Sequence, residues 1–441
     1  MLKLNKVSTR LSWLIRYPAF LTFLVCVLFY FLPFKPKPFG DGEYHQGTLQ
    51  LLQFIRHGFS GEVEVTKGLF TLLYYVVPYS FASLWNTEKM YLLFGLVYNW
   101  LAVSAGVGIM FKLFREQGLS ERLQVFVFLL LNLFPIHVYY GMGILAESSA
   151  FLLSSLFVYF LVTIYKGNKE SYLHYVGLSL SLAFFLSVRP NFMPYALLFL
   201  PIILLMKKPS LYRSIAAGVF VSAVCLLVLM EKKLDHSDAE FKKFQLVKGF
   251  VWSRYELRDE PFNWLPQHGM DAFASIDYKN NIKKRVEIIK VCKEQHLDMQ
   301  EYAFNWMVQD IKMHPGLFMR QIFLKYFQSQ TFVVTPLMKS KANGFLKWGI
   351  HVYINILNYV LLLSVFYSAW LWWKNKRAFN YFLPLLLFYA TAFITIFFLH
   401  SEQRYVFPTR PAVLVMLAFA LHAFFSRKAI EVQPSVERDN G

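Results

Sequence analysis

Long apolar runs alternate with short polar segments along most of the chain. Ten of these runs are close to the roughly 20 residues that an α-helix needs to cross the hydrocarbon core of a bilayer. Backbone polar groups in lipid find no water, so each crossing segment must pair them internally and is expected to be helical. The pattern predicts an all-α polytopic membrane protein with about ten transmembrane helices, at residues 17–33, 90–111, 123–139, 148–165, 173–188, 192–206, 214–230, 346–373, 381–399 and 405–425.

Basic residues set the expected orientation of these runs. Several lysines and arginines precede the first run, so the positive-inside rule puts the N-terminus in the cytoplasm. With ten spans, every short inner loop is basic and both termini lie inside. Residues 69–85 are apolar but short and contain Pro78. Counting this run as a span would move the later basic loops outside, so we interpret it as re-entrant or interfacial.

The remaining polar stretches divide the chain into three expected parts. Residues 1–230 form an N-terminal membrane module, in which 44–59 have a helical apolar period typical of an interfacial helix. Residues 231–345 have a composition like that of a soluble domain and are expected to be a mostly helical extracytoplasmic segment. It contains two amphipathic helices at 279–291 and 297–311, the second ended by Pro315. Residues 346–441 form a C-terminal membrane module.

Composition and charge support the membrane assignment. Of the 441 residues, 56% are hydrophobic and only 16% are charged, whereas a soluble domain carries about 25% charged residues. The net charge of +18 is expected from basic inner loops and contacts with anionic membrane lipids, and not from a nucleic-acid partner. The first apolar run has no small-residue cleavage site after it, so we expect a retained anchor. The bacterial inner (plasma) membrane is the expected location.

Ionisable residues from distant segments fall on the outer side of this topology. Charged groups near the bilayer plane are costly and usually functional. Each also has a plainer interpretation: a solvated turn at Asp41-Gly42-Glu43, an arginine that snorkels to headgroups at Arg189, or a helix cap at Glu147. Their joint placement favours function. The residues are Asp41, Glu43 and His45 in the first outer loop, Glu147, Arg189, and His400, Glu402 and Arg404 between the last two runs.

This set of side chains suits glycosyl transfer from a lipid phosphate. The leaving phosphate needs fixed cations, and the guanidinium of arginine binds phosphate through two parallel hydrogen bonds. The attacking hydroxyl or amine of the acceptor needs a carboxylate base within hydrogen-bond reach. The sequence has no glycine-rich nucleotide loop and no spacing typical of metal ligands, such as His-x-x-x-His, a cysteine pair or Asp-x-Asp. A nucleotide-sugar donor and a built metal site are therefore not expected.

Three sets of residues also have the spacing of motifs that occur together in one family. With them the chain resembles the GT-C class of polytopic glycosyltransferases, which includes protein O-mannosyltransferases and the bacterial enzyme that adds aminoarabinose to lipid A. The stretches are Asp41-Gly42-Glu43-Tyr44, then Leu145-Ala146-Glu147-Ser148 with Val188-Arg189-Pro190, and finally His400-Ser401-Glu402-Gln403-Arg404-Tyr405-Val406-Phe407-Pro408.

The resemblance implies a reaction and a set of site residues. It implies an inverting transfer from a polyprenyl-phosphate-sugar donor to a lipid, glycan or protein acceptor, with a divalent metal needed in some relatives. The first outer loop would supply the base. The family often has two adjacent acids where Gly42 separates them here, so both Asp41 and Glu43 are candidates, Asp41 being favoured by position. The implied substrate-binding residues are Tyr44, His45, Glu147, Arg189, His400, Glu402, Arg404 and Tyr405.

Two other classes of function fit a polytopic membrane protein. A transporter or flippase of lipid-linked sugars would predict internal repeats and ionisable groups near the middle of the membrane, and neither is visible in the sequence. A non-catalytic scaffold of glycan assembly would not need the acidic motif of the first outer loop. The sequence therefore favours the enzyme.

Overall fold

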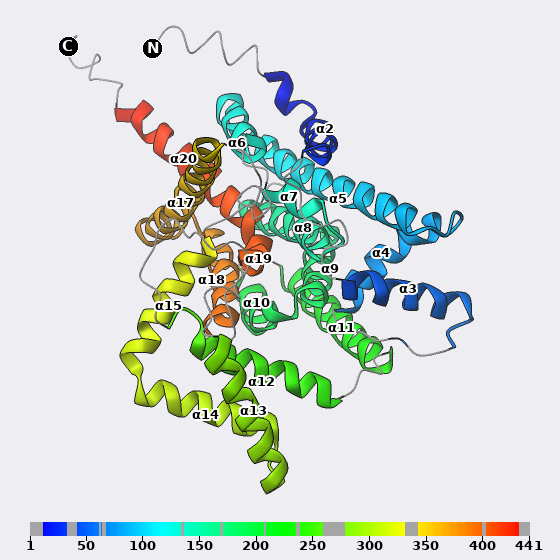
Figure 1. Cartoon of the computed structure of the whole chain (residues 1–441). Helices are drawn as coiled ribbons and strands as arrows, with labels where there is room; N and C mark the ends of the chain where they lie inside the picture. Colours follow the sequence, from blue (N-terminus) through cyan, green and yellow to red (C-terminus); the bar gives the residue numbers. More distant parts are fainter. Residues whose placement is uncertain are drawn as a thin grey trace, which may run out of the picture.

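The structure, a computed structural model, contains helices joined by turns. It describes residues 12–32, 42–60, 63, 68–133, 136–167, 171–206, 209–234, 239–258, 278–330, 343–398 and 403–431. Within these ranges the regular elements are all helical, which confirms the predicted all-α class (Figure 1).

The N-terminal part is a row of packed helices with α8 at its centre. Helix α8 lies between α5 and α9, and α9 in turn packs on α11. Gly106 of α5 allows a close approach to α8, because a Cβ at this position would clash with the ring of Phe151 and crowd Ser155. The helices are α2 (Pro18–Tyr30), α3 (Gly42–Arg56), α4 (Leu69–Ala82), α5 (Glu88–Glu116), α6 (Glu121–Leu133), α7 (Ile136–Gly141), α8 (Glu147–Lys166), α9 (Tyr172–Val188), α10 (Met193–Leu205) and α11 (Ser210–Leu234).

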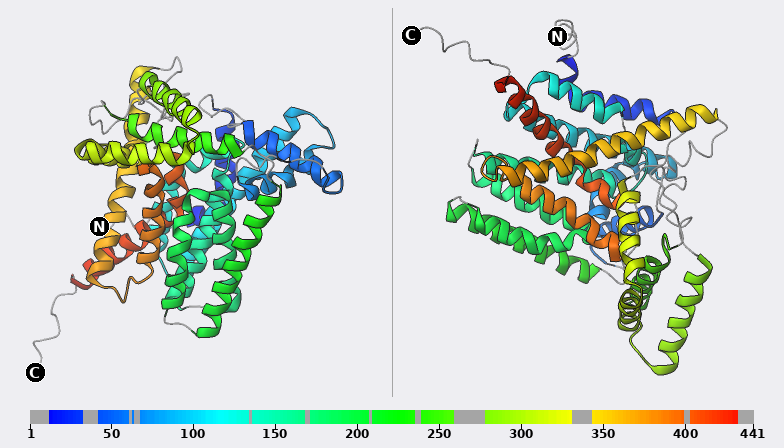
Figure 2. Two further views of the ribbon diagram at one scale, coloured as in Figure 1. Left: turned by 90° about the horizontal axis from the view of Figure 1, so that it is seen from below. Right: turned by 90° about the vertical axis from the view of Figure 1, so that its left-hand side faces the viewer.

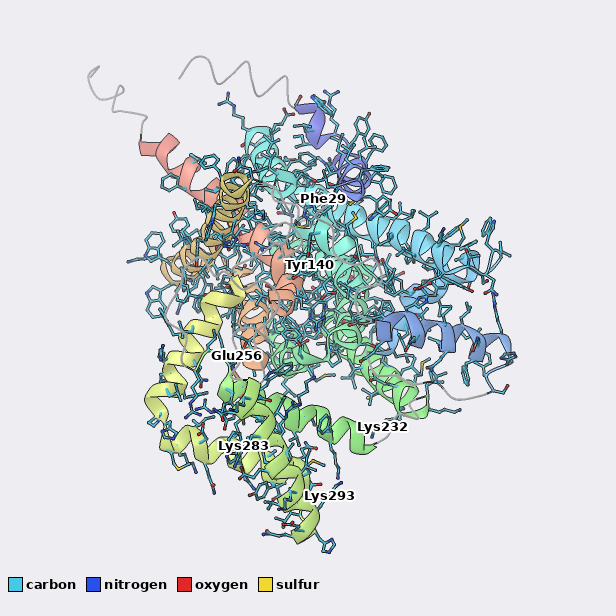
Figure 3. All side chains as sticks on the ribbon, in the orientation of Figure 1. Phe29, Tyr140, Lys232, Glu256, Lys283 and Lys293 are labelled. Carbon is cyan, nitrogen blue, oxygen red and sulfur yellow. The ribbon has the colours of Figure 1, made fainter. Side chains whose placement is uncertain are left out.

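The C-terminal helices close the bundle on its other side. They are α17 (Gly344–Lys374), α18 (Phe382–Phe398), α19 (Gln403–Val406), the 3-10 turn η4 (Phe407–Thr409) and α20 (Arg410–Glu431). Helix α20 packs on both α17 and α8, and α18 packs on α10. Phe407 lies 4.6 Å from Tyr140 and 5.8 Å from Phe151 between ring centroids, so η4 enters the centre of the molecule, where Figure 3 labels Tyr140.

Five helices of the described part are long and apolar enough to cross a membrane, where the sequence predicted about ten. These are α5, α8, α11, α17 and the run Arg404–Phe425. Four more predicted spans correspond to α2, α9, α10 and α18, which have 13–17 residues and therefore a length of about 20–26 Å, less than a typical core of ~30 Å. The predicted span 123–139 contains two separate helices, α6 and α7.

Helices α12 to α15 form a separate layer against one side of the bundle, clearest in the left view of Figure 2. They are α12 (Ala239–Tyr255), α13 (Tyr278–Gln295), α14 (Met299–Met313) and α15 (Pro315–Gln330). The two amphipathic helices predicted here are confirmed as α13 and α14. Val247, Val251, Ile288 and Ala303 form a small apolar core. Helices α12 and α15 contact α18, and α15 also contacts α19.

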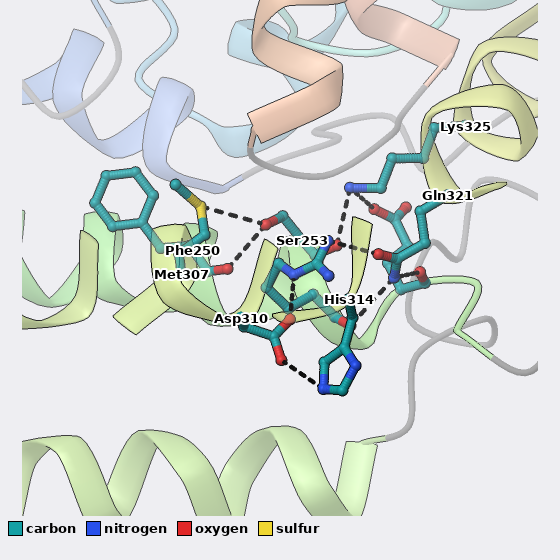
Figure 4. Close-up of polar contacts among 9 residues, drawn as sticks. Phe250, Ser253, Met307, Asp310, His314, Gln321 and Lys325 are labelled. Atoms are coloured by element: carbon teal, nitrogen blue, oxygen red, sulfur yellow. Dashed lines mark hydrogen bonds and ion pairs between the residues drawn. The ribbon is translucent and has the colours of Figure 1, made fainter. Parts of the chain in front are cut away.

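A buried polar network joins α12 to α14 and α15 (Figure 4). The guanidinium of Arg254 donates through Nε to Asp310 at 2.6 Å and through Nη1 to Gln321 at 2.7 Å. The Lys325 ammonium lies 3.2 Å from Glu256, and both side chains are at most 1% exposed. Burial lowers the pKa of Lys325, and the neighbouring Glu256 acts in the opposite direction. Buried pairs add little net stability but specify one arrangement of the helices that they join.

Candidate functional site

A buried ion pair joins the start of α8 to the end of α9. A terminal nitrogen of Arg189 lies 2.5 Å from Oε1 of Glu147, and the two side chains are 8% and 1% exposed. Arg189 therefore does not extend to the membrane surface, and Glu147 does more than begin a helix. The positive end of the α8 dipole also favours the Glu147 carboxylate in the first helical turn.

The position of Arg189 follows from the proline after it. Proline disfavours helical geometry in the preceding residue, and Arg189 has φ −131° and ψ 75° where α9 ends. Pro190 then begins the short η2 turn (Pro190–Phe192). The start of α4 supports this break, because Ser187 Oγ accepts a hydrogen bond from the backbone N–H of Phe70 at 3.2 Å.

Gly68 allows the backbone of α4 to approach α9 this closely. Its φ is +73°, and a Cβ at this position would overlap the carbonyl oxygen of Ser187. Glycine is the residue that satisfies both conditions without strain. The contact ties the start of α4 to the end of α9, next to Arg189.

Two further predicted residues are close to this pair. Arg189 interacts electrostatically with Tyr44 of α3 and with Arg404 of α19. Tyr44 is 6% exposed, and the Arg404 guanidinium lies 5.7 Å from the ring centroid of the adjacent Tyr405. The structure thus brings together Tyr44, Glu147, Arg189 and Arg404, which come from four segments far apart in the sequence. Two of these four side chains are guanidinium groups, which suit the oxygens of a phosphate.

Residues that the sequence analysis missed hold the turn before Glu147. The Tyr75 hydroxyl accepts from the backbone N–H of Leu145 at 2.9 Å and lies 2.7 Å from the carbonyl oxygen of Leu145. The Asn99 side chain is 3.0 Å from the same hydroxyl and donates to the carbonyl oxygen of Gly143 at 2.7 Å. Tyr75 and Asn99 are both fully buried. A polar asparagine in the middle of the apolar run 90–111 was the available signal for this role.

His45 lies in an aromatic group with Tyr79 and Tyr91. Its Nδ1 is 2.7 Å from the Tyr79 hydroxyl, and its ring is 6.2 Å from that of Tyr91 between centroids. Burial lowers the pKa of His45, and the charge of Glu88 raises it in part. The contact with Tyr79 fixes the orientation of the imidazole ring.

Three predicted site residues, Asp41, His400 and Glu402, lie outside the described residues. Glu43 is described at the start of α3, where it is exposed. Glu43 and Arg404 each have further interactions within the structure. Of the seven predicted site residues that the structure describes, Tyr44, Glu147, Arg189 and Arg404 are grouped together. His45 lies against Tyr79 near the end of α4, and Tyr405 lies beside Arg404.

A second polar group lies deeper in the membrane part, at the start of α20. Arg410 Nη2 donates to Asn358 Oδ1 at 2.8 Å. Next to it, Gln330, Tyr389 and Thr409 line a crevice of ≈ 20 Å³, about enough space for one water molecule. The Tyr389 hydroxyl lies 3.3 Å from Gln330. These hydrogen bonds link α15 to α18 and α20 to α17.

Metal ligands do not gather in the part of the chain that the structure covers. No three His, Cys, Asp or Glu side chains lie close enough there to hold a metal ion. Comparisons with protein-family models, with curated proteins and with solved structures found no match to this chain. The function must therefore be argued from the site itself.

Proposed function

We propose that this protein is a membrane glycosyltransferase that moves a sugar from a polyprenyl-phosphate donor to a lipid, glycan or protein acceptor. The observation that carries the proposal is the meeting of Tyr44, Glu147, Arg189 and Arg404 at one end of the bundle. A largely buried pair beside a second arginine, at the end of membrane helices, is costly unless it serves function. The guanidinium groups of Arg189 and Arg404 suit the phosphate of a lipid carrier.

The reaction requires one proton acceptor and one charge stabiliser. A hydroxyl of the molecule that receives the sugar attacks the anomeric carbon. The bond from that carbon to the phosphate oxygen breaks, and the configuration at the carbon inverts. The proton passes to a carboxylate, for which Asp41 is proposed, with Glu43 orienting the acceptor. The polyprenyl phosphate leaves with the bonding electrons, and Arg404 stabilises its charge.

Glu147 has a positioning role in this proposal. At 2.5 Å it holds Arg189 and neutralises much of its charge, so Arg404 carries the phosphate contact and Arg189 maintains the positive potential behind it. In this proposal His45 and Tyr405 line the side of the site that binds the sugar. His400 and Glu402, which precede Arg404 in the segment between the last two apolar runs, are also proposed to bind the substrate. Such fixed charges in a site shielded from water are more effective than the same charges in solution.

We also propose that ten segments span the membrane, with the site facing the extracytoplasmic side. The support is the distribution of basic residues between the spans. In a cysteine-free background, Lys283→Cys on exposed α13 should react with an impermeant thiol reagent added outside cells. Lys112→Cys, exposed near the end of α5, should react only after permeabilisation. The reverse pattern would contradict the orientation.

A reconstituted transfer assay tests the activity. Purified protein in liposomes would be given polyprenyl-phosphate donors with radiolabelled sugars and membrane lipids as acceptors. The expected result is labelled acceptor together with one equivalent of sugar-free polyprenyl phosphate. Asp41→Asn should abolish transfer, since a positioned base contributes about 10²–10⁴ in rate. Movement of the intact donor across the bilayer without cleavage would instead identify a flippase.

A further inference from the structure

Helix α17 ends in a basic turn on the side of the bundle away from α15. The right view of Figure 2 shows α17 running from the side of α15 to the opposite end of the bundle. Lys374 is the last residue of α17, and Lys376 and Arg377 follow in the turn before α18. All three side chains are exposed. We call these three residues the basic turn.

Hydrogen bonds give the basic turn a defined shape. The backbone N–H of Asn375 donates to the carbonyl oxygen of Leu371 at 2.9 Å, and that of Phe379 donates to the carbonyl oxygen of Asn375 at 3.1 Å. The Asn375 side chain accepts from the backbone N–H of Ala378 at 3.1 Å. The three cations are therefore held together on one hydrogen-bonded turn between two membrane helices.

No carboxylate of the described residues neutralises the basic turn. Among the ion pairs of the described part, none includes Lys374, Lys376 or Arg377. The sequence explains this, because no aspartate or glutamate occurs between Asp310 and Glu402. The negative end of the α17 dipole favours Lys374, but Lys376 and Arg377 lie beyond the helix. Like charges on one turn repel each other, and an anion bound from outside removes that repulsion.

Two tryptophan rings place one of these cations at the depth of the lipid headgroups. The Lys376 ammonium lies 5.5 Å from the ring centroid of Trp372 and 5.3 Å from that of Trp373, which is the range of a cation–π interaction. Tryptophan is typical of the membrane–water interface. Trp373 is 68% exposed, so its indole faces lipid in a bilayer. The ammonium above it therefore lies at the level of the phosphates of that leaflet.

An apolar face of α17 leads from the interior of the membrane to the basic turn. Leu363, Phe366, Trp370 and Trp373 recur at helical spacing, and all four are exposed. The rise from Leu363 to Trp373 is about 15 Å, at 1.5 Å per residue, which is half of a ~30 Å hydrocarbon core. This is the thickness of one leaflet. A phospholipid whose acyl chains lie on this face has its phosphate at the basic turn.

We propose that the basic turn binds the headgroup of an anionic phospholipid, whose acyl chains lie along the exposed face of α17. The inference is independent of the proposed reaction, because α19, which carries Arg404, packs on α15 at the other end of the bundle. The apolar face and the tryptophan rings favour a lipid over an acidic protein segment, which would need only the charges.

The test measures the affinity of single lipid molecules for the full-length protein. Purified protein in a neutral detergent is titrated with phosphatidylglycerol or phosphatidylcholine, and the tightest-binding lipid is quantified by native mass spectrometry. One triple variant replaces each residue of the basic turn with glutamine. The matched control combines Lys279→Gln, Lys283→Gln and Lys293→Gln, which removes the same charge from exposed positions of α13.

The proposal expects a loss that is selective for the anionic lipid. Wild type should bind phosphatidylglycerol at least about tenfold more tightly than phosphatidylcholine, since each lysine or arginine contributes about fivefold. The basic-turn variant should lose that preference and keep its affinity for phosphatidylcholine. The α13 variant should match wild type with both lipids. Lys376→Arg should preserve binding, because arginine keeps the charge and also stacks on tryptophan.

Four results would overturn the proposal. The first is an equal affinity of wild type and the basic-turn variant for phosphatidylglycerol, and the second is an equal loss in the α13 variant, which would indicate net charge alone. The third is displacement of the lipid by an equal concentration of free glycerol phosphate, which would identify a soluble phosphate as the ligand. The fourth is tight binding of hexaglutamate that phosphatidylglycerol does not displace, which would assign the turn to an acidic protein segment.

Single substitutions keep the test decisive if the triple variant does not fold. Lys374→Gln and Arg377→Gln each change one exposed side chain and should each weaken phosphatidylglycerol binding by about fivefold. Wild-type affinity in both single variants would equally contradict the assignment.

Discussion

Removing the charge of Glu147 should cost both stability and activity. The carboxylate is 1% exposed and 2.5 Å from Arg189, and at an effective dielectric constant of ~20 the attraction is about 7 kcal/mol. Desolvation of the two ions opposes most of this, several kcal/mol for each. The intact pair is therefore worth little, but Glu147→Gln leaves a buried, uncompensated guanidinium. We expect the free energy of unfolding to fall by about 3–5 kcal/mol.

A second variant separates stability from function. The double change Glu147→Gln with Arg189→Met removes both charges, so its free energy of unfolding should be closer to wild type than that of Glu147→Gln alone. Its transfer activity should stay low, because Arg189 no longer supplies the positive potential behind Arg404. Unfolding is followed by intrinsic fluorescence in detergent and activity by the liposome transfer assay.

The control is an exposed ion pair of the same charge type. Lys290 and Glu294 on α13 are 3.8 Å apart and 71% and 61% exposed, so Lys290→Gln should change the free energy of unfolding by less than ~1 kcal/mol. Equal stability of Glu147→Gln and wild type would refute the reasoning, since it would mean that Arg189 needs no buried counter-charge. Full activity of the double variant would show that Glu147 and Arg189 are not needed for the reaction.

Three more changes test other parts of the structure. Arg404→Lys keeps the charge but loses the planar guanidinium that makes two parallel hydrogen bonds to phosphate. The ratio kcat/KM should therefore fall by the equivalent of about 2–4 kcal/mol. Turnover near that of wild type would exclude Arg404 as the phosphate ligand. Burial lowers the pKa of His45, and the charge of Glu88 raises it in part. Glu88→Gln should therefore lower this pKa further and move the acid limb of the pH–rate profile to lower pH. A shift of the acid limb to higher pH would contradict this. Lys325→Met leaves Glu256 buried without its ammonium partner and should lower the free energy of unfolding by about 3–5 kcal/mol. A thermal midpoint equal to that of wild type would refute this prediction.

The sequence alone was enough for the class of the protein and for several of its local features. Apolar runs without water must satisfy their own backbone hydrogen bonds, which makes them helices wherever they occur. In the same way, Pro190 ends α9 and the periodic apolar positions define α13 and α14. These are short-range effects, in which each residue acts through its neighbours in the chain.

The charged site was decided by the tertiary structure. The sequence left Glu147 as either a cap or a site residue and Arg189 as either a snorkelling or a binding residue, because each choice depends on what packs against the side chain. The contact of α8 with α9 buries both groups and places their opposite charges 2.5 Å apart. Asn99 stood out as a polar residue in an apolar run, but its role and that of Tyr75 could not be predicted, since only the folded bundle brings their partners at Leu145 and Gly143 to them.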